Sequence, residues 1–443
     1  MQLKRAAASL STRQRLMAAS CALLGATSAR GEDGVTAPAP SGLFGTLLDN
    51  VTLDSALAYY HENGRIRAVE PIVDVSKVFS GGSTLGVDGV FDSLSGSTPN
   101  GALPSRAPQT FASPSAKGLG AGSRTYTTAP GGLPVDPHYH DERVAFGLAW
   151  NQPLTRTLGL SLGAKVSDEH DFVSLTTSAS LASAFNEKNT TVSLGITDEI
   201  DSVKPIGGAP LAGSNYALFE KTGGSKSKDG VGALLGVTQI ITRQWISEFD
   251  LSADRFTGYL NDPYKIISVL DGGGHVTGYQ YESRPDERTR RGAYLENRLA
   301  GNALSAALSL RYTSDDWRVR SDTAELRMRW TFAERVRYLE PVVRWYRQTA
   351  ADFYVPWLDA ALQTGTTFAS SDSRLAPLHS MTYGIKFAER MGDASDPQAS
   401  ELNVRLQYYR QTFDSPRSIP AALQGLDLIP ALNAIMLQVG WRF

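Results

Sequence analysis

Histidine and carboxylate side chains gather in the stretch HYHDE, residues 138–142. His138, His140 and Asp141 offer the imidazole and carboxylate groups that suit Zn²⁺, Ni²⁺ or Cu²⁺. The spacing indicates no fourth ligand, and clusters of this kind in surface loops are more often simply solvated. The stretch is a weak candidate metal site, and we expect no cofactor.

The sequence gives equally weak evidence for a hydrolase. A serine hydrolase needs a serine, a histidine and an orienting polar group together in space. His170 lies beside Asp171 and His379 beside Ser380, but the sequence contains no nucleophile-elbow motif. The glycine-rich stretch DGGGH, residues 271–275, lacks the helix and lysine that follow a phosphate-binding loop. We therefore predict no catalytic residues and no enzyme activity.

The charge balance and the single cysteine exclude some classes of function and some kinds of site. The chain has 43 Lys and Arg against 45 Asp and Glu, so it lacks the basic surface typical of a nucleic-acid-binding protein. Cys21 is the only cysteine, and it lies within an apolar stretch near the N-terminus. If that stretch is removed on export, disulfides and cysteine-based metal sites are excluded.

The first residues have the three parts of a secretory signal. Lys4 and Arg5 begin a basic region, LMAASCALLGA is an apolar core, and small residues allow cleavage near Ala29. We expect a signal peptide at residues 1–29, export through the Sec pathway, and a periplasmic lead segment at 30–50. The sequence AASC resembles a weak lipobox, so lipidation of Cys21 remains the less favoured alternative. No later run of apolar residues is long enough for a transmembrane helix.

Apolar and polar residues alternate with a period of two from Leu53 onward, which is the pattern of β-strands. Examples are VAFGLAWN, LGLSLGAKV, LSAALSLRY and ELNVRLQYY. The strands are about nine to fourteen residues long, whereas strands of soluble proteins most often have about five or six. Long alternating strands with polar inner faces are typical of a transmembrane barrel.

Short and long connections also alternate. Long loops are expected at residues 93–141, 201–229, 261–288, 350–376 and 415–430, all at one end, with short turns at the other. We predict an all-β, antiparallel transmembrane barrel over residues 51–443, of about sixteen strands with an error of about two. Both termini are then periplasmic. The loop at 93–141, rich in Gly, Ser, Pro and Ala, could fold into the lumen as a constriction or simply end a strand.

The polar face of each strand then points inward and carries charged residues. Acids dominate the early strands and bases the later ones, which would place a transverse field across a wide lumen. A sealed interior filled with ion pairs is the alternative. The predicted lumen-lining residues are Glu70, Asp74, Asp88, Lys165, Glu248, Asp250, Glu296, Arg298, Arg311, Arg327, Arg329, Arg344, Lys386 and Arg405.

The last strand places Leu437, Val439, Trp441 and Phe443 on one face. This pattern resembles the C-terminal signal that the barrel assembly machinery of bacteria recognises, and its aromatic residues suit a membrane interface.

One segment points to a family. YYHENGRIRAVEP at Tyr59–Pro71 and DSLSGSTPNGA at Asp92–Ala102 resemble the DUF3570 family of uncharacterised bacterial outer-membrane proteins. Ser97 and Thr98 stand where that family typically has Ala and Ser. The resemblance implies an outer-membrane β-barrel and implies little about activity.

Taken together, these patterns predict an integral outer-membrane barrel that passes or binds small polar solutes, with outer-membrane lipid as its surroundings. A non-conducting barrel that serves as a scaffold for a periplasmic or surface partner is the alternative, and a hydrolase at the barrel rim is a distant third.

Overall fold

Sixteen long antiparallel strands close into one barrel in the computed structural model of the chain. The structure describes residues 50–443 except 114–124, 219, 334–335, 362–367, 392–398 and 417. The predicted signal peptide with Cys21, and the predicted lead segment up to residue 49, therefore lie outside the described residues. The predicted fold class and strand number are confirmed.

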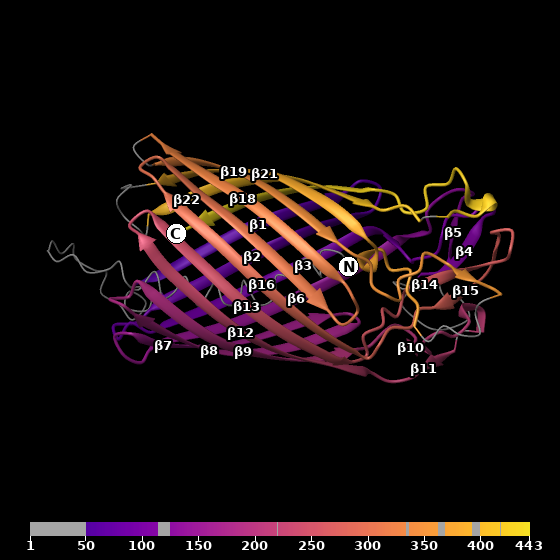
Figure 1. Cartoon of the computed structure of the whole chain (residues 1–443), viewed down its shortest axis with the longest axis horizontal. Coiled ribbons are helices and arrows are strands. Elements are labelled where there is room, and N and C mark those ends of the chain that lie inside the picture. Colours follow the sequence, from indigo (N-terminus) through magenta and orange to yellow (C-terminus); the bar gives the residue numbers. More distant parts are fainter. Residues whose placement is uncertain are drawn as a thin grey trace, which may run out of the picture.

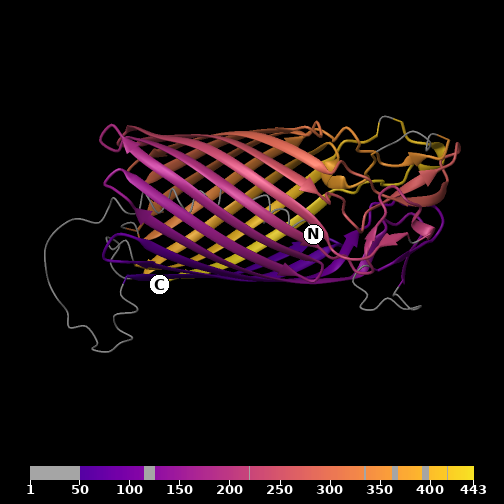
Figure 2. The ribbon, with the colours of Figure 1, turned by 90° about the horizontal axis from the view of Figure 1, so that it is seen from below.

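The barrel strands follow one another in chain order around the wall, so each pairs with its neighbours in sequence (Figures 1 and 2). They are β1 (Val51–Glu62), β2 (Ile66–Val78), β3 (Thr84–Pro99), β6 (Val135–Pro153), β7 (Leu158–Glu169), β8 (Phe172–Phe185), β9 (Thr190–Val203), β12 (Lys226–Thr242), β13 (Trp245–Gly258), β16 (Glu287–Ala300), β17 (Leu304–Asp315), β18 (Arg320–Phe332), β19 (Arg337–Gln348), β21 (Leu378–Met391), β22 (Ser400–Phe413) and β23 (Leu432–Arg442).

Closure joins the first strand to the last. β1 pairs with β23 in a register that sets Leu57 opposite Val439. Beyond the ladder, the backbone groups of Leu53 and Phe443 exchange two hydrogen bonds of 3.2 and 2.8 Å. No strand edge is left open at this seam, which is what a barrel in a hydrocarbon layer requires.

The period-two pattern sorts side chains between the two faces of the wall. On β9, Leu194, Ile196 and Ile200 point outward with 54–61% of their surface exposed, while Glu199 and Asp201 point inward. Large apolar side chains are exposed in the same way on strands all around the barrel. Because such a surface is unfavourable in water, the outer wall is suited to lipid.

The long loops gather at one end of the barrel into a compact cap, seen beyond the strands in Figures 1 and 2. We define the cap as the described residues of 100–134, 204–225, 259–286, 349–377 and 414–431. Its short elements are β4 (Gln109–Ala112), β5 (Thr125–Thr128), β10 (Ala209–Pro210), η1 (Tyr216–Leu218), β11 (Lys221–Thr222), β14 (Ile266–Leu270), β15 (Val276–Tyr281), β20 (Leu358–Asp359), η2 (Ser373–Leu375) and η3 (Ala421–Leu423).

Most of the buried apolar residues of the described chain lie in this cap. β14 is the central strand of a three-stranded sheet, and all five of its residues are buried. Phe111 packs against Tyr126 of its own loop and against Tyr279 of loop 259–286. The cap thus has a hydrophobic core of its own, of the kind found in a small soluble domain.

Two strands extend further than the sequence indicates. β3 continues to Pro99 and β6 begins at Val135, so the loop expected at 93–141 spans only 100–134. Its described residues form the β4–β5 hairpin and pack in the cap against Ile266 and Tyr281. The extra strand length comes from continued pairing between Thr98 and Asp136, which a bulge near Gly96 allows. No helix among the described residues is long and apolar enough to cross a membrane.

Candidate functional site

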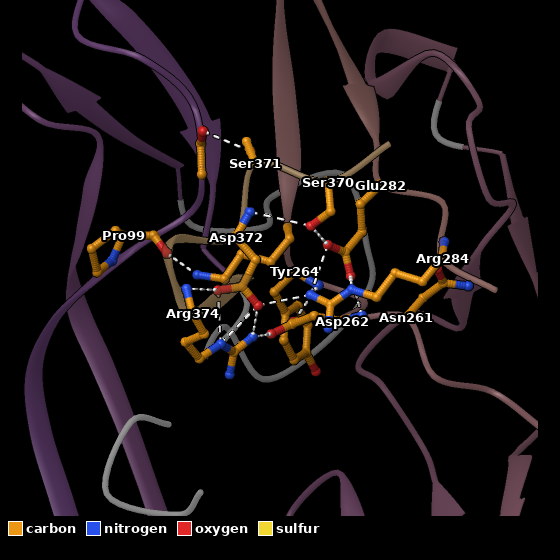
Figure 3. Close-up of polar contacts among 12 residues, drawn as sticks. Pro99, Asn261, Asp262, Tyr264, Glu282, Arg284, Ser370, Ser371, Asp372 and Arg374 are labelled. Carbon is orange, nitrogen blue, oxygen red and sulfur yellow. Dashed lines mark hydrogen bonds and ion pairs between the residues drawn. The ribbon is translucent and has the colours of Figure 1, made fainter. Parts of the chain in front are cut away.

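Three loops of the cap are joined by a buried group of six charged residues, which we call the clasp: Asp262, Lys265, Glu282, Arg284, Asp372 and Arg374 (Figure 3). Arg284 Nη2 donates to Glu282 at 2.8 Å and to Asp372 at 2.7 Å. Arg374 Nη2 lies 2.6 Å from Asp262. Loops 259–286 and 349–377 are therefore tied together by charge-assisted hydrogen bonds.

The third loop of the clasp comes from the end of β3. Lys265 Nζ donates to the carbonyl of Pro99. Ser371 Oγ lies 2.9 Å from the carbonyl oxygens of both Gly101 and Ile266. Gly101 has a φ of 97°, and a Cβ there would lie 2.7 Å from Ile266 O, so only glycine allows the backbones to come so close.

The charges of the clasp balance three against three, and their environment shifts the pKa values. Burial alone would raise the pKa of Asp372, but Arg374 and Arg284 hold it well below its usual value. Arg374 and Lys265 likewise outweigh burial at Asp262 and lower its pKa. Burial raises the pKa of Glu282. With its charges balanced and most of its groups buried, the clasp is a structural joint and offers little to a charged ligand.

The inner face of the barrel carries a second charged network, centred on Glu296 of β16. Glu296 has no exposed surface and accepts hydrogen bonds from Tyr294, Arg298 and Arg327. Arg298 Nη2 also lies 3.5 Å from Glu248 on β13, and Arg327 Nε lies 3.2 Å from Glu325 on β18. Four neighbouring strands, β13, β16, β17 and β18, are thus crossed by one ionic ladder.

The ladder continues toward the seam. Arg329 Nε donates to Glu340 at 2.7 Å, and the Arg329 guanidinium lies 4.2 Å from the ring centre of Tyr338. The Tyr338 hydroxyl donates to Glu401 at 2.8 Å, and Lys386 Nζ lies 3.5 Å from the same carboxylate. The basic residues predicted for the later strands are therefore largely matched by acids.

On the early strands, Lys165 is one of the bases that meet acids, beside Arg143, which pairs with Asp92, and Lys228, which pairs with Asp201. Lys165 Nζ lies 3.1 Å from Asp88, although β6 separates the two strands. Gly147 of β6 lies between them in register, and a Cβ at this position would clash with the Asp88 carboxylate. The missing side chain opens the space through which Lys165 reaches Asp88. Asp74 lies directly opposite Asp88 on β2.

A small cavity of about 100 Å³ lies on the wall at the seam. Its lining includes Glu70 of β2 and Arg405 of β22, with Ala58 and Gln438 between them. These four residues form one continuous row in register across β2, β1, β23 and β22. Because the side chain of Ala58 is short, it leaves a hollow in this row, with Glu70 on one side and Arg405 on the other.

The remaining predicted lumen residues lie around these groups. The Arg311 guanidinium is 5.4 Å from the Tyr294 ring centre. Asp250 is opposite Tyr294 in register, and Arg344 is opposite Glu325 with its side chain exposed. On β19 the neighbouring Val343 and Trp345 face outward, so Arg344 lies on the inner face.

The histidine cluster does not assemble as the sequence suggested. His140 has the strand parity of the outward Val144 and Phe146, whereas Asp141 has the opposite parity, and His138 is an exposed residue of the irregular pairing between Asp136 and Tyr139. His140 Nε2 lies 3.3 Å from Glu142. Asp141 instead approaches Glu169 and Asp171, with carboxylate oxygens within 4.8 Å of one another, a grouping that could accept a hard cation. Only the strand register brings these three acids together.

The other sequence neighbours also separate. Adjacent residues on a strand point to opposite faces, so His379 faces outward toward Asp414 at 3.3 Å while Ser380 is buried on the inner face. Asp271 of the glycine-rich stretch accepts hydrogen bonds from the backbone of Gly273 and His275, which closes the β14–β15 turn.

Leu437, Val439 and Phe443 are exposed on the outer wall, and Phe443 stacks on Trp441 with 5.3 Å between ring centres.

The predicted inner-wall residues omit Arg143, Lys228 and Glu401, which form ion pairs there, and sequence reasoning missed the clasp altogether. Arg284 and Asp372 are 88 residues apart, and neither lies in a periodic segment that would indicate its direction. Charged residues are no more frequent in loops 259–286 and 349–377 together than in the whole chain, so composition gave no signal either.

Comparison with known proteins gives one family and several similar folds. The outer membrane protein OpdK of Pseudomonas aeruginosa is 11% identical, covers 89% of this chain and 98% of its own, and has a TM-score of 0.39. OccD3 (OpdP) of the same organism is 10% identical over 89% of this chain and 91% of its own, with a TM-score of 0.41. A bacterial polysaccharide outer membrane secretin is 10% identical over 89% and 98%, with a TM-score of 0.41. No curated protein matches the sequence.

A family whose description reads "Protein of unknown function (DUF3570)" matches residues 13–443, nearly the whole chain. The resemblance carried by Tyr59–Pro71 and Asp92–Ala102 is thereby confirmed, and the chain belongs to the DUF3570 family.

Proposed function

We propose that the protein is an outer-membrane barrel that admits or binds small polar solutes, with periplasmic termini and with the cap on the outside of the cell. A closed antiparallel barrel with an apolar outer wall is the β-structure that satisfies its backbone within lipid, which supports the membrane location. Catalysis and cofactors have no part in this proposal.

The observation that carries the proposal is the exposure of charged side chains inside the wall. The side chains of Lys165, Arg327 and Arg329 keep 39%, 34% and 42% of their surface exposed although they lie on the inner face. A packed and sealed interior would leave such groups almost fully buried. Water-accessible charge along the inner wall supports a hydrated lumen.

The arrangement of the charges favours polar or charged solutes over apolar ones. Most bases of the later strands already have acidic partners, so the wall offers paired charges with donors and acceptors side by side. Glu70 and Arg405 flank the seam cavity from opposite sides. A solute that carries both an acidic and a basic group would match this pair of side chains.

Conductance in planar lipid bilayers tests the proposal. The purified barrel should give discrete conductance steps, and Arg344→Glu should shift the reversal potential toward cation preference, since Arg344 is exposed on the inner face. Arg318→Glu is the matched control, because Arg318 is an exposed arginine of the β17–β18 turn. A correctly folded barrel that gives no conductance and takes up no solute in liposome swelling would refute the proposal and favour a scaffold role.

A further inference from the structure

The outer wall changes from apolar to charged at a defined height near the cap. On β19 the outward apolar residues Leu339, Val343 and Trp345 lie between two outward arginines. Arg337 lies at one end of the strand and Arg347, ten residues later, at the cap end. At about 3.3 Å per residue and a tilt of about 35–45°, ten residues rise roughly 25 Å, the height of the apolar band of such barrels. Arg347 therefore lies where lipid headgroups begin.

Outward charged residues at this level differ in sign around the barrel. On β6, β7 and β9 they are acidic: Glu142, Asp168 and Asp198. From β13 to β22, arginines predominate: Arg255, Arg291, Arg347 and Arg410. The level thus carries acids on one side, the acidic sector, and mostly arginines on the other, the basic sector, although Glu287, the partner of Arg255, and Asp322 lie among these arginines.

Within the basic sector, three residues form what we call the outer basic patch: Arg347, His379 and Arg410. Arg347 and His379 are direct partners between β19 and β21. Arg410 is opposite Met381, two residues along β21 from His379. Cross-strand partners lie about 5 Å apart and diagonal neighbours about 7–8 Å, so all three side chains can reach one small anion.

The two arginines of the patch have no ion pair in the described part of the chain, although Asp322 is opposite Arg347 in register. His379 is held by Asp414 at 3.3 Å. An exposed aromatic group lies directly on the apolar side of the patch: Trp345, Tyr383 and Tyr408. Trp and Tyr rings in this position mark the interface between hydrocarbon and headgroups.

We propose that the outer basic patch binds the phosphate of an outer-leaflet lipid, whose acyl chains lie along Trp345, Tyr383 and Tyr408. The inference rests on the membrane location proposed above but not on solute passage. Guanidinium groups are suited to phosphate, and the apolar wall below them is suited to the chains of the same molecule. Because the patch faces outward, a solute of the lumen is not its ligand.

Native mass spectrometry of the folded, full barrel in detergent tests this assignment, with lipid A as the probe. The double variant Arg347→Gln/Arg410→Gln should bind lipid A on the order of tenfold more weakly than the unaltered protein. Asp168→Asn/Asp198→Asn is the matched control in the acidic sector and should not weaken binding. Unheated gel mobility verifies that each variant is folded, and Arg347→Lys/Arg410→Lys tests the role of charge should the glutamine variant misfold.

Two further probes separate the lipid from other sources of the same chemistry. Dephosphorylated lipid A should bind more weakly to the unaltered protein, and inorganic phosphate should fail to compete at equal concentration. Equal binding by the double variant, equal binding of the dephosphorylated lipid, or effective competition by inorganic phosphate would each overturn the proposal. The binding experiment does not depend on conductance. Loss of lipid binding at the patch can therefore be distinguished from the absence of an open channel.

Discussion

Neighbouring residues on one strand of this barrel meet opposite environments. Arg405 of β22 lies beside the seam cavity, while Leu406 is 49% exposed on the outer wall among other apolar side chains. The two positions share backbone, strand and height. They differ only in the face on which the side chain lies.

Leu406→Arg should impair folding into lipid, because a charge near the middle of the apolar wall costs roughly 2–4 kcal/mol. Arg405→Leu should fold and, in an open lumen, shift ion preference toward cations. Unheated gel mobility after refolding into liposomes measures the first effect, and reversal potential measures the second. If Leu406→Arg folded normally while Arg405→Leu did not, the inner and outer faces of β22 would be reversed.

At the scale of elements, the cap behaves as a small folded unit attached to the barrel. Its loops come from five places in the chain, and buried apolar clusters and the clasp hold them together. The clasp lies at the junction of β3 with loops 259–286 and 349–377. Its integrity should therefore control whether the cap stays closed while the barrel itself remains intact.

Arg284→Met should loosen the cap, because removal of one partner from a buried ion pair costs about 3–5 kcal/mol. Glu282 would lose its main basic partner, and Asp372 would keep Arg374 and Lys265. We expect faster cleavage within loops 259–286 and 349–377 under limited proteolysis, with unchanged unheated gel mobility. Arg318→Met is the matched control, since its pair with Asp352 is 3.5 Å long and exposed, and such pairs contribute little. Equal protection of both variants would show that the clasp does not hold the cap.

The clasp also predicts how the cap responds to acid. Arg374 and the other bases outweigh burial and lower the pKa values of Asp262 and Asp372. A carboxyl whose folded pKa is depressed stabilises the fold above its unfolded pKa of about 3.9, and this contribution is lost as the pH falls through the folded value. Protection of the cap from proteolysis or hydrogen exchange should therefore be steady near neutral pH and should fall below about pH 4.

Glu282 acts in the opposite direction, because burial raises its pKa and so favours the protonated acid. Glu282→Gln removes this contribution and leaves both aspartates in place. The loss of protection in acid should persist in that variant, as measured by hydrogen exchange of β14. A cap equally protected from pH 7 to pH 3 would contradict the role assigned to the aspartates.

At the scale of the whole molecule, apolar residues occupy two separate places. Most large apolar side chains of the barrel point out toward lipid, and the compact buried clusters lie mainly in the cap. The barrel is therefore held by its continuous backbone ladder, closed at β1 and β23, rather than by a central hydrophobic core.

This division predicts a β-rich circular dichroism spectrum and a heat-modifiable gel shift, in which the unheated protein migrates faster than the boiled protein. The closed ladder should resist detergent at room temperature, since unfolding must break pairing along whole strands. Cap variants such as Arg284→Met should keep the shift, whereas Leu406→Arg should lose it. A helix-dominated spectrum would contradict the barrel outright.

The sequence alone determined the wall of this protein. The alternation of apolar and polar residues along stretches such as LSAALSLRY is a local property. A strand with one apolar face can place that face against lipid in only one orientation. Loop lengths then indicated which ends of the strands lie together. For these reasons the sixteen strands, their faces and the single loop-rich end could be predicted without coordinates.

Tertiary structure alone decided which charged groups meet. Asp141 approaches Glu169 and Asp171 rather than His138 and His140, because register between strands sets the partners and strand parity places His140 on the outer face. Lys165 reaches Asp88 only because Gly147 lies between them. The clasp joins loops far apart in sequence, and irregular backbone has no period from which a side chain's direction can be read. Local pattern fixes the face of a residue, but its partner depends on the closure of the whole barrel.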